Sequence, residues 1–254
     1  MGSVNSHIQM PKCVLRNFMD DQQLLHYYDF QTGTIKQGRA ASLDTELGYY
    51  SQDVEDYLRD NVEAPFGRVM AKVKNITKDD VFEISNTLFD DVRTFLYALM
   101  SRSVEMLDAI NKSSVFFQFL PEQAQHDYAA VQGIELSKQR GLLDDWLITF
   151  AVNDSEVPFV LPQLGLYPFG LKFCQSCHNL PISPRTSITL FPNKYIAEFV
   201  NNGVVKLLFV ADDEIAQKFN NKAFATEKKH NRQRIISDSR KEIERLTELY
   251  QYQL

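Results

Sequence analysis

The stretch Asp145-Trp-Leu-Ile-Thr-Phe-Ala-Val152 marks the point where the chain changes from helical patterns to strand patterns. It is rich in β-branched and aromatic residues, which are favoured on a pleated surface, so it predicts a strand. Three later segments of similar composition, 157–161, 187–191 and 206–210, also predict strands. Prolines interrupt this half of the chain repeatedly, as is typical of loops around a sheet.

Upstream of this stretch the apolar residues recur at three- and four-residue steps, which predicts helices. One helix is expected over 53–74, where Pro65 should kink it or begin a new turn. Thr77-Lys-Asp-Asp80 resembles a capping box with Asp in place of Glu, and it predicts a helical stripe from there to Asn111. Pro121 precedes a further predicted helix over 122–136.

The two ends of the chain complete the predicted fold. The aromatic segment 24–30, the loop Gln31-Thr-Gly-Thr34 and Ile35-Lys36 predict a β-hairpin. The segment 212–221 and the charged stretch 235–254 predict helices. The expected class is α+β: an N-terminal β-hairpin, a helical middle, and a C-terminal mixed or antiparallel sheet closed by a long helix. We expect a single domain over 1–254, with a helical subregion at 51–136 and a β-rich subregion at 145–210.

Composition narrows the function classes. A net charge of −6 argues against a chain devoted to non-specific DNA binding. Three cysteines in 254 residues do not indicate a disulfide framework, so we expect a reducing, cytoplasmic setting. The first ten residues carry no apolar signal-peptide region and no run of eighteen apolar residues exists, so no membrane partner is expected.

Cys174-Gln-Ser-Cys177-His178 is the most conspicuous motif of the chain. C-x-x-C-H attaches c-type haem, but that chemistry needs export, so no haem is expected. Structural zinc would need further ligands, and neither a second C-x-x-C nor an H-x-x-H is present, so the pattern favours a loop with free thiols. Gly-rich phosphate loops, G-x-S-x-G and H-E-x-x-H are also missing, so no nucleotide cofactor is expected, while a divalent metal stays open.

The segment 228–234, Lys-Lys-His-Asn-Arg-Gln-Arg, is a basic cluster in an acidic chain. Several cations on one face could contact phosphates. The alternative is a solvated helix start balanced by the later glutamates, and the composition favours that interpretation.

A set of ionisable residues lies beside apolar or proline-containing segments. The candidate catalytic residues are His7, Glu63, Asp154 and Glu156, and the candidate anion-binding residues are Arg16, Arg102 and Arg185. Brought together, they could perform acid–base or metal-assisted phosphodiester chemistry with arginine on the phosphate. They could equally form buried salt bridges that hold irregular loops, and the residues alone favour that structural role.

The order of these residues resembles the bacterial family known as domain of unknown function 4238. The resemblance spans nearly the whole chain. It is carried by His7 and Pro11-x-x-x-Leu15-Arg-Asn-Phe18, the hairpin, Glu63, Arg102-Ser103, Ser155-Glu-Val-Pro-Phe159 and Pro181-Ile-Ser-Pro184-Arg185. The resemblance implies a stand-alone bacterial protein, for which we expect a nuclease-like effector in phage or self-defence that acts on nucleic acid.

Two alternatives stay open. The first is a non-catalytic module that binds a protein partner or a second copy through the C-terminal helix, whose apolar residues would be Leu246, Leu249, Tyr250 and Leu254. The second is a sensor of a small anionic ligand gripped by arginines.

Overall fold

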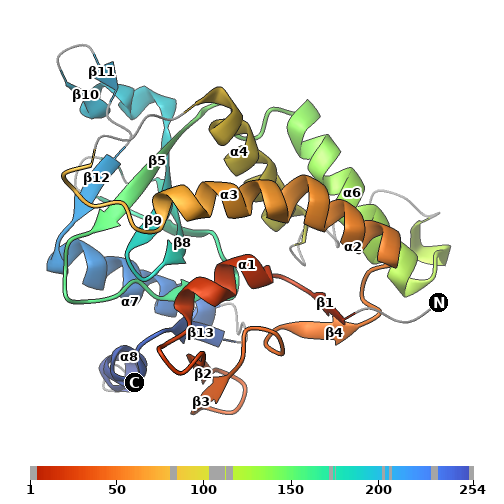
Figure 1. Cartoon of the computed structure of the whole chain (residues 1–254), viewed down its shortest axis with the longest axis horizontal. Helices are drawn as coiled ribbons and strands as arrows, with labels where there is room; N and C mark the ends of the chain where they lie inside the picture. The colour runs from red at the N-terminus through yellow and green to blue at the C-terminus, as the bar shows by residue number, and fades with distance from the viewer. Residues whose placement is uncertain are drawn as a thin grey trace. The chain divides into compact units, whose positions relative to one another are not determined.

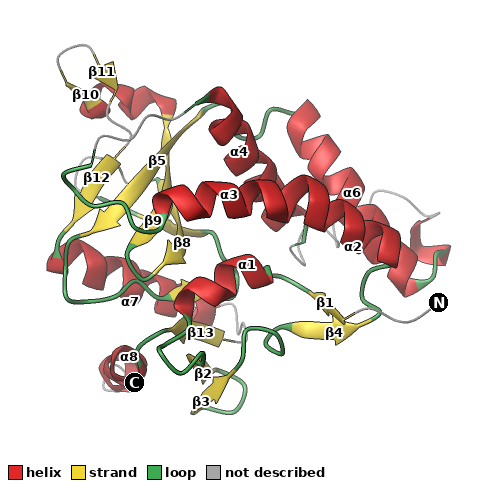
Figure 2. Cartoon of the chain, viewed as in Figure 1, coloured by secondary structure: helices red, strands yellow, loops and turns green. Residues whose placement is uncertain are grey.

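The computed structural model describes residues 5–80, 85–102, 112, 117–171, 174, 176–201, 204–205, 208–229 and 234–251. The class is α+β, as predicted (Figure 2). The chain divides into two compact units built from interleaved segments. Unit 1 consists of Met1–Cys13, Leu43–Ala71 and Glu83–Asp144, and unit 2 consists of Val14–Ser42, Lys72–Phe82 and Asp145–Leu254. The expectation of a single domain stays a prediction.

Unit 1 is mainly helical (Figure 1). Its elements are β1 (Asn5–His7), β4 (Thr45–Leu47), α2 (Gln52–Leu58), the π-helical turn η2 (Arg59–Glu63), α3 (Ala64–Val73, whose last two residues belong to unit 2), α4 (Asn86–Ser101), η3 (Phe117–Phe119) and α6 (Glu122–Gln139). Strands β1 and β4 form a two-stranded antiparallel sheet, in which His7 lies opposite Thr45. A short element, α1 (Lys12–Leu15), crosses from unit 1 into unit 2.

The helices of unit 1 form where the apolar periodicity predicts them. Ser51 caps α2, and Ser85 caps α4 through its hydroxyl, because each side chain accepts a backbone N–H three residues later. The rings of Phe66 and Phe95 stack at 3.6 Å and join the buried stripes of α3 and α4. Helix α6 approaches α4 closely at Gly133, where an added Cβ would lie 2.6 Å from the Ser101 Cβ.

Two predicted helices of this region differ from the observed ones. The 53–74 helix is interrupted by η2, and α3 begins one residue before Pro65, as the proline predicts. The helix predicted to begin at Thr77 is wrong for 77–80, which form an exposed turn; in it the Asp80 carboxylate accepts hydrogen bonds from the Thr77 backbone N–H and hydroxyl. The next helix begins at Asn86 instead, and the predicted positions 81–84 and 103–111 lie outside the described residues.

Unit 2 contains the larger sheets, drawn in yellow in Figure 2. The five-stranded sheet has the order β12 (Leu208–Ala211), β5 (Trp146–Asn153), β9 (Thr186–Pro192), β8 (Cys177–Ser183) and β7 (Tyr167–Phe169). The four-stranded sheet has the order β3 (Thr34–Gly38), β2 (Leu25–Asp29), β13 (Arg234–Ser237) and β6 (Leu161–Pro162). The remaining elements are η1 (Arg16–Phe18), η4 (Asn193–Phe199), β10 (Val200–Asn201), β11 (Val204–Val205), α7 (Asp213–Lys229) and α8 (Arg240–Gln251). The β12–β5 pair is parallel, and the other pairs in these two sheets are antiparallel.

The structure corrects three predictions in unit 2. The segment predicted as a strand over 157–161 is irregular except for its last residue, Leu161, where β6 begins. The helix predicted from Ile235 begins only at Arg240, because Ile235 and Ile236 belong to β13 between β2 and β6. Strand β8 was not predicted, since its Pro181 argues against a strand; the proline sits beside a register shift, where the sheet tolerates it.

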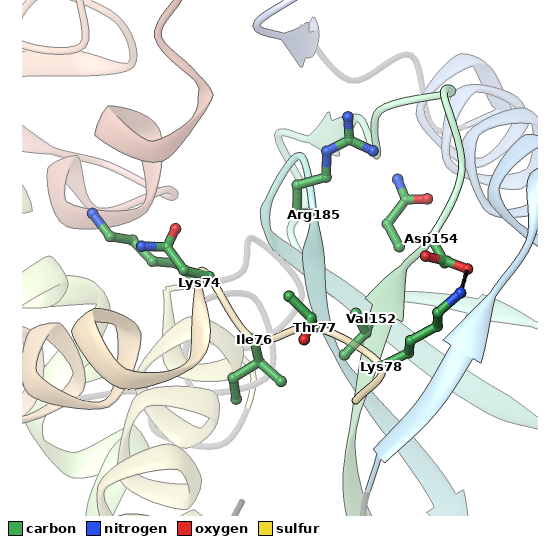
Figure 3. A pocket seen from close by; sticks show the side chains of 9 residues that line it. Lys74, Ile76, Thr77, Lys78, Val152, Asp154 and Arg185 are labelled. Carbon is green, nitrogen blue, oxygen red and sulfur yellow. Dashed lines mark hydrogen bonds and ion pairs between the residues drawn. The ribbon is translucent and has the colours of Figure 1, made fainter. Parts of the chain in front are cut away.

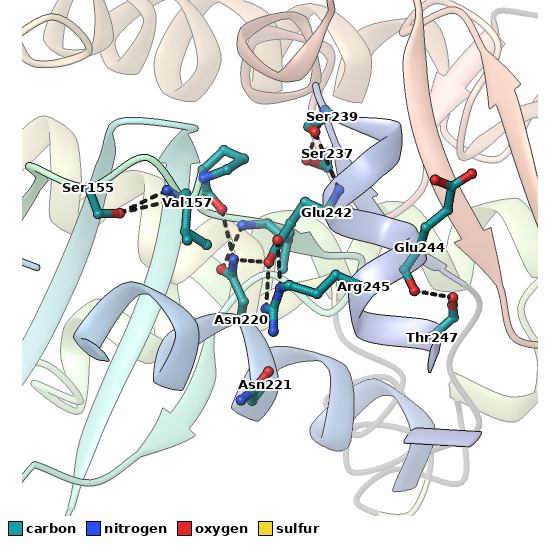
Figure 4. A network of polar contacts seen from close by, with 12 residues as sticks. Ser155, Val157, Asn220, Asn221, Ser237, Ser239, Glu242, Glu244, Arg245 and Thr247 are labelled. Carbon is teal, nitrogen blue, oxygen red and sulfur yellow. Dashed lines mark hydrogen bonds and ion pairs between the residues drawn. The ribbon is translucent and has the colours of Figure 1, made fainter. Parts of the chain in front are cut away.

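A buried polar network joins α7 and α8 to the irregular segment before β6 (Figure 4). The Asn220 side chain, fully buried on α7, donates to the Pro158 carbonyl and to Glu242 at 2.7 Å each, and its oxygen accepts from the Val160 N–H at 3.0 Å. Two further bonds of 2.8 and 2.7 Å join Arg245 to Glu242. A side chain therefore replaces a strand partner, which explains why this segment is ordered without being β-structure.

Candidate functional site

The candidate site in unit 1 is centred on Arg102, the residue that caps the C-terminus of α4. Its side chain is 2% exposed, and its Nη2 donates to Glu63 Oε1 at 3.1 Å. Glu63 ends the π-helical turn η2 and is 25% exposed at its side chain. Two residues predicted from the sequence, 39 positions apart, are thus joined in one ion pair.

The third predicted residue, His7, belongs to the same cluster. Burial is the main cause that lowers its pKa, and the Lys12 and Arg102 charges add to this; Glu63 and a hydrogen bond with the Leu43 backbone oppose it. The imidazole is therefore neutral near pH 7. Its Nδ1 atom is buried and has no hydrogen-bond partner among the described residues. His7 thus presents an unused ring nitrogen inside the unit.

Arg102 also has unused donors. Its Nε and Nη1 atoms are buried and find no hydrogen-bond acceptor in the described part of the chain. Burial favours the neutral form of this guanidinium, but Glu63 and the nearby Tyr50 and Glu55 outweigh it, so that the pKa of Arg102 is raised. A buried cation with unpaired donors is uncommon and needs an explanation in water, an ion or function.

Two further acids surround this guanidinium. Burial raises the pKa of Glu55, against the opposing effects of a hydrogen bond with Ser6 and of the Arg102 charge. Burial likewise raises the pKa of Tyr50, so its phenol stays neutral. We did not predict either residue; Tyr50 lies in a turn-rich stretch and Glu55 in the first turn of α2, and neither position carries a sequence signal. The cluster offers a donor-rich cation beside a neutral base.

The other predicted residues lie in unit 2. Arg16 is exposed in η1, and Glu156 is exposed in the turn after β5. Asp154 and Arg185 line one pocket of about 270 Å³ together with Lys78 and Asn153, which the sequence analysis missed. Asn153 could have been found as the neighbour of Asp154 at the strand end, whereas nothing in the local sequence marks Lys78. The structure therefore describes two separate polar groups, each within its own unit.

The Cys174/Cys177/His178 motif lies in the core of unit 2. Both thiols are free and fully buried, and burial raises the pKa of the Cys177 thiol. His178 follows on β8, so it points to the opposite face from Cys177, where it meets the Trp146 ring edge-on at 5.0 Å. Cys177 and His178 therefore cannot ligate one ion in this strand. Over the described residues, no group of three or more histidine, cysteine or acidic side chains is arranged to hold a metal.

The basic cluster is described only at its ends. Lys228 and Lys229 complete α7, and Arg234 opens β13, while 230–233 lie outside the described residues. The Lys228 ammonium lies 5.8 Å from the centre of the Tyr250 ring.

The C-terminal helix uses its apolar face within unit 2. Leu246 is fully buried in the core, and the Tyr250 ring stacks on Phe224 at 4.7 Å and donates its hydroxyl to the Asn221 carbonyl. Leu249 is 37% exposed, and Leu254 lies outside the described residues. Two of the four residues that the binding-module alternative requires, Leu246 and Tyr250, are thus packed within unit 2.

Among the described helices, none combines the length and the apolar character needed to cross a membrane. Comparison with protein-family models, with curated proteins and with solved structures found no match. The resemblance to domain of unknown function 4238 therefore stays a prediction.

Proposed function

We propose that the Arg102 cluster of unit 1 binds a phosphate group of a nucleic acid and cleaves a phosphodiester bond there. The observation that carries this proposal is the set of buried polar atoms without a hydrogen-bond partner among the described residues: Nε and Nη1 of Arg102, and Nδ1 of His7. A guanidinium is a strong hydrogen-bond donor to phosphate oxygens, and buried donors without a partner are uncommon in an ion pair that only holds the fold.

Each residue has a distinct task in the proposed reaction. Arg102 donates one of its unused N–H groups, that of Nε or of Nη1, to a phosphate oxygen, while its Nη2 stays on Glu63, which fixes the plane of the guanidinium. Neutral His7 accepts a proton from the attacking water or ribose hydroxyl as the new P–O bond forms. The leaving oxygen departs as its bond to phosphorus breaks and takes up a proton from water. Glu63 is the partly exposed member of the pair, so we propose that the substrate approaches Arg102 from the side of Glu63.

Cleavage of labelled single-stranded RNA, single-stranded DNA and double-stranded DNA, each with and without Mg²⁺, tests the proposal. We expect His7→Gln to slow cleavage by about 100-fold or more, the usual scale for loss of a general base. Arg102→Lys keeps the charge but loses the fork, and we expect a similar loss. Arg68→Lys, at an exposed position on α3, is the matched control and should keep full activity.

Two outcomes would contradict the proposal. One is that the parent protein cleaves none of these substrates under either condition. The other is that His7→Gln cleaves as fast as the parent while circular dichroism shows both to be folded. The defence setting rests on the family resemblance alone. If it is right, expression of the parent chain should slow growth of a bacterial host, and His7→Gln should relieve this.

A further inference from the structure

The pocket of unit 2 lies where β5 ends, a position separate from the Arg102 cluster. Its walls are the loop 74–78, the end of β5 with the following turn, and the turn between β8 and β9 (Figure 3). Its volume of about 270 Å³ is at the small end of the range for ligand sites. Asp154 follows β5 at the carboxyl end of a parallel strand pair, since its N–H donates to Ala211 at the end of β12. Carboxyl ends of parallel strands are common places for ligands.

Hydrogen bonds fix each wall in place. The Thr186 hydroxyl donates to the Val73 carbonyl at 3.1 Å and lies 3.4 Å from the Lys74 carbonyl. These contacts hold the start of the loop against β9. Asn153 joins the end of β5 to the β8–β9 turn, because its N–H donates to Arg185 and its side chain to Pro184. The pocket is therefore largely preformed, which lowers the entropic cost of binding.

The charges in the pocket favour an anion. Arg185, Lys78 and Lys74 line it together with one carboxylate, Asp154. Among the lining residues themselves, three cations therefore face one carboxylate. Two further acids act on these cations from outside the lining: Asp79 on Lys78, and Asp238, whose pKa burial raises, on Arg185.

Two of these cations can meet a ligand. The Arg185 Nη1 donates to the Ser155 carbonyl, which orients the guanidinium, and its other nitrogens have no hydrogen-bond partner among the residues that the structure describes. Lys78 is paired with Asp154 at 2.9 Å, but both side chains are nearly half exposed, and such pairs contribute little. An arriving anion can therefore compete with Asp154 for Lys78. In Figure 3 the Lys74 chain extends away from Arg185 and Asp154, so Lys74 contributes charge rather than a contact.

The opposite part of the pocket is apolar. Ile76 and Val152, both largely buried in the fold, line it away from the Arg185 guanidinium (Figure 3). A ligand that fits has an anionic head on Arg185 and Lys78 and a small apolar body over Ile76 and Val152. We infer that this pocket binds a small organic phosphate monoester. A phosphate offers three acceptor oxygens to the two cations, whereas a carboxylate offers two.

Calorimetric titration of the whole chain with phenyl phosphate, benzoate and phenol tests this inference. We expect saturable binding of phenyl phosphate, binding of benzoate about fivefold or more weaker, and no binding of phenol. Arg185→Gln should weaken phenyl phosphate about tenfold or more, since it removes a charge-assisted contact. Arg39→Gln makes the same chemical change at an exposed position of unit 2 and should leave binding unchanged.

Asp154→Asn distinguishes a ligand site from a structural ion pair. It frees Lys78 for the ligand, so we expect binding to tighten about two- to fivefold, whereas a structural role predicts no gain. If Arg185→Gln fails to fold, Arg185→Lys should still weaken binding, because the fork is lost. No saturable binding of phenyl phosphate, equal binding of benzoate, equal effects of Arg185→Gln and Arg39→Gln, or unchanged or weaker binding by Asp154→Asn would each overturn the inference. Arg102→Lys should leave this binding unchanged, so failure of the nuclease proposal and failure of this one can be told apart.

Discussion

Glu63→Gln is the change that examines the centre of unit 1 most directly. It removes the charge that faces Arg102 while keeping an oxygen that can accept the Nη2 hydrogen bond, whose length is 3.1 Å. Breaking a buried ion pair by neutralising one partner costs about 3–5 kcal/mol, because the other charge stays desolvated. The Arg102 side chain is desolvated, with 2% exposure, but Glu63 is 25% exposed. Water at this position and the charge of Glu55 therefore stabilise the remaining Arg102 charge in part and reduce the loss of stability. We expect unit 1 to lose about 2 kcal/mol.

The assay has to report on unit 1 alone. The chain has one tryptophan, Trp146, which lies on β5 in unit 2, so its fluorescence does not follow this change. Hydrogen exchange of the α4 amides follows the stability of unit 1. A loss of 2 kcal/mol in the free energy of unfolding corresponds to about thirtyfold faster exchange if these amides open with the whole unit. Glu135→Gln, which removes a 46% exposed carboxylate on α6, should change exchange by less than about threefold.

The comparison of Glu63→Gln with Glu135→Gln shows whether the Glu63–Arg102 pair stabilises unit 1. If Glu63→Gln changes α4 exchange no more than Glu135→Gln does, the pair contributes as little as a surface contact and the reasoning fails. A double change, Glu63→Leu with Arg102→Met, replaces both charges by apolar groups. We expect it to restore most of the stability and to abolish cleavage, since a buried pair can be exchanged for packed apolar side chains without large loss.

Three further predictions concern other parts of the two units. The pKa of His7 is lowered below its ordinary 6.5, so the unfolded state binds more protons below that pH, and unit 1 should lose stability between about pH 7.5 and 5.5. His7→Gln should flatten that dependence in hydrogen exchange, and an unchanged slope would contradict it. Gly133→Ala should destabilise unit 1 by about 1–3 kcal/mol through its clash with α4, whereas Gly67→Ala, with nothing near an added Cβ, should gain up to about 1 kcal/mol; equal effects would refute the close approach. Asn220→Ala should cost unit 2 about 2–4 kcal/mol by tryptophan fluorescence, because it leaves the Val160 N–H and the Pro158 carbonyl unpaired. Asn221→Ala should cost less than about 1 kcal/mol, and a cost below 1 kcal/mol for Asn220→Ala would show that water replaces the side chain.

Local patterns predicted the elements whose own residues carry a clear composition or periodicity. The hairpin β2–β3, strand β5 and helix α6 all formed where composition and periodicity indicated them. The errors occurred where a distant group decides the conformation. Ile235 and Ile236 read as the start of a charged helix, yet they pair with β2 and β6 from far upstream. No window around either residue contains that information.

The residues of the candidate sites were likewise predicted only in part. The order of the motifs singled out His7, Glu63 and Arg102, and the fold brings these three residues together. Each of them lies at the end of a regular element. The order of the motifs also singled out Glu156, whose exposed side chain has no described contact with the pocket beside it. Pocket residue Lys78 could not be predicted, because its position depends on where the loop after α3 meets the end of β5.

The interleaving of the two units has a consequence for synthesis on the ribosome. The chain passes between units five times, and the last segment of unit 1 ends at Asp144. Unit 1 can therefore be complete while most of unit 2 is still untranslated. The β2–β3 hairpin is made early, but its other neighbour, β13, follows roughly 200 residues later, a delay of roughly ten to forty seconds at ordinary elongation rates. During that interval one edge of β2 has no native partner, and a two-stranded hairpin is marginal by itself. Slower translation of the second half should therefore raise aggregation of this chain more than it changes the stability of the finished protein.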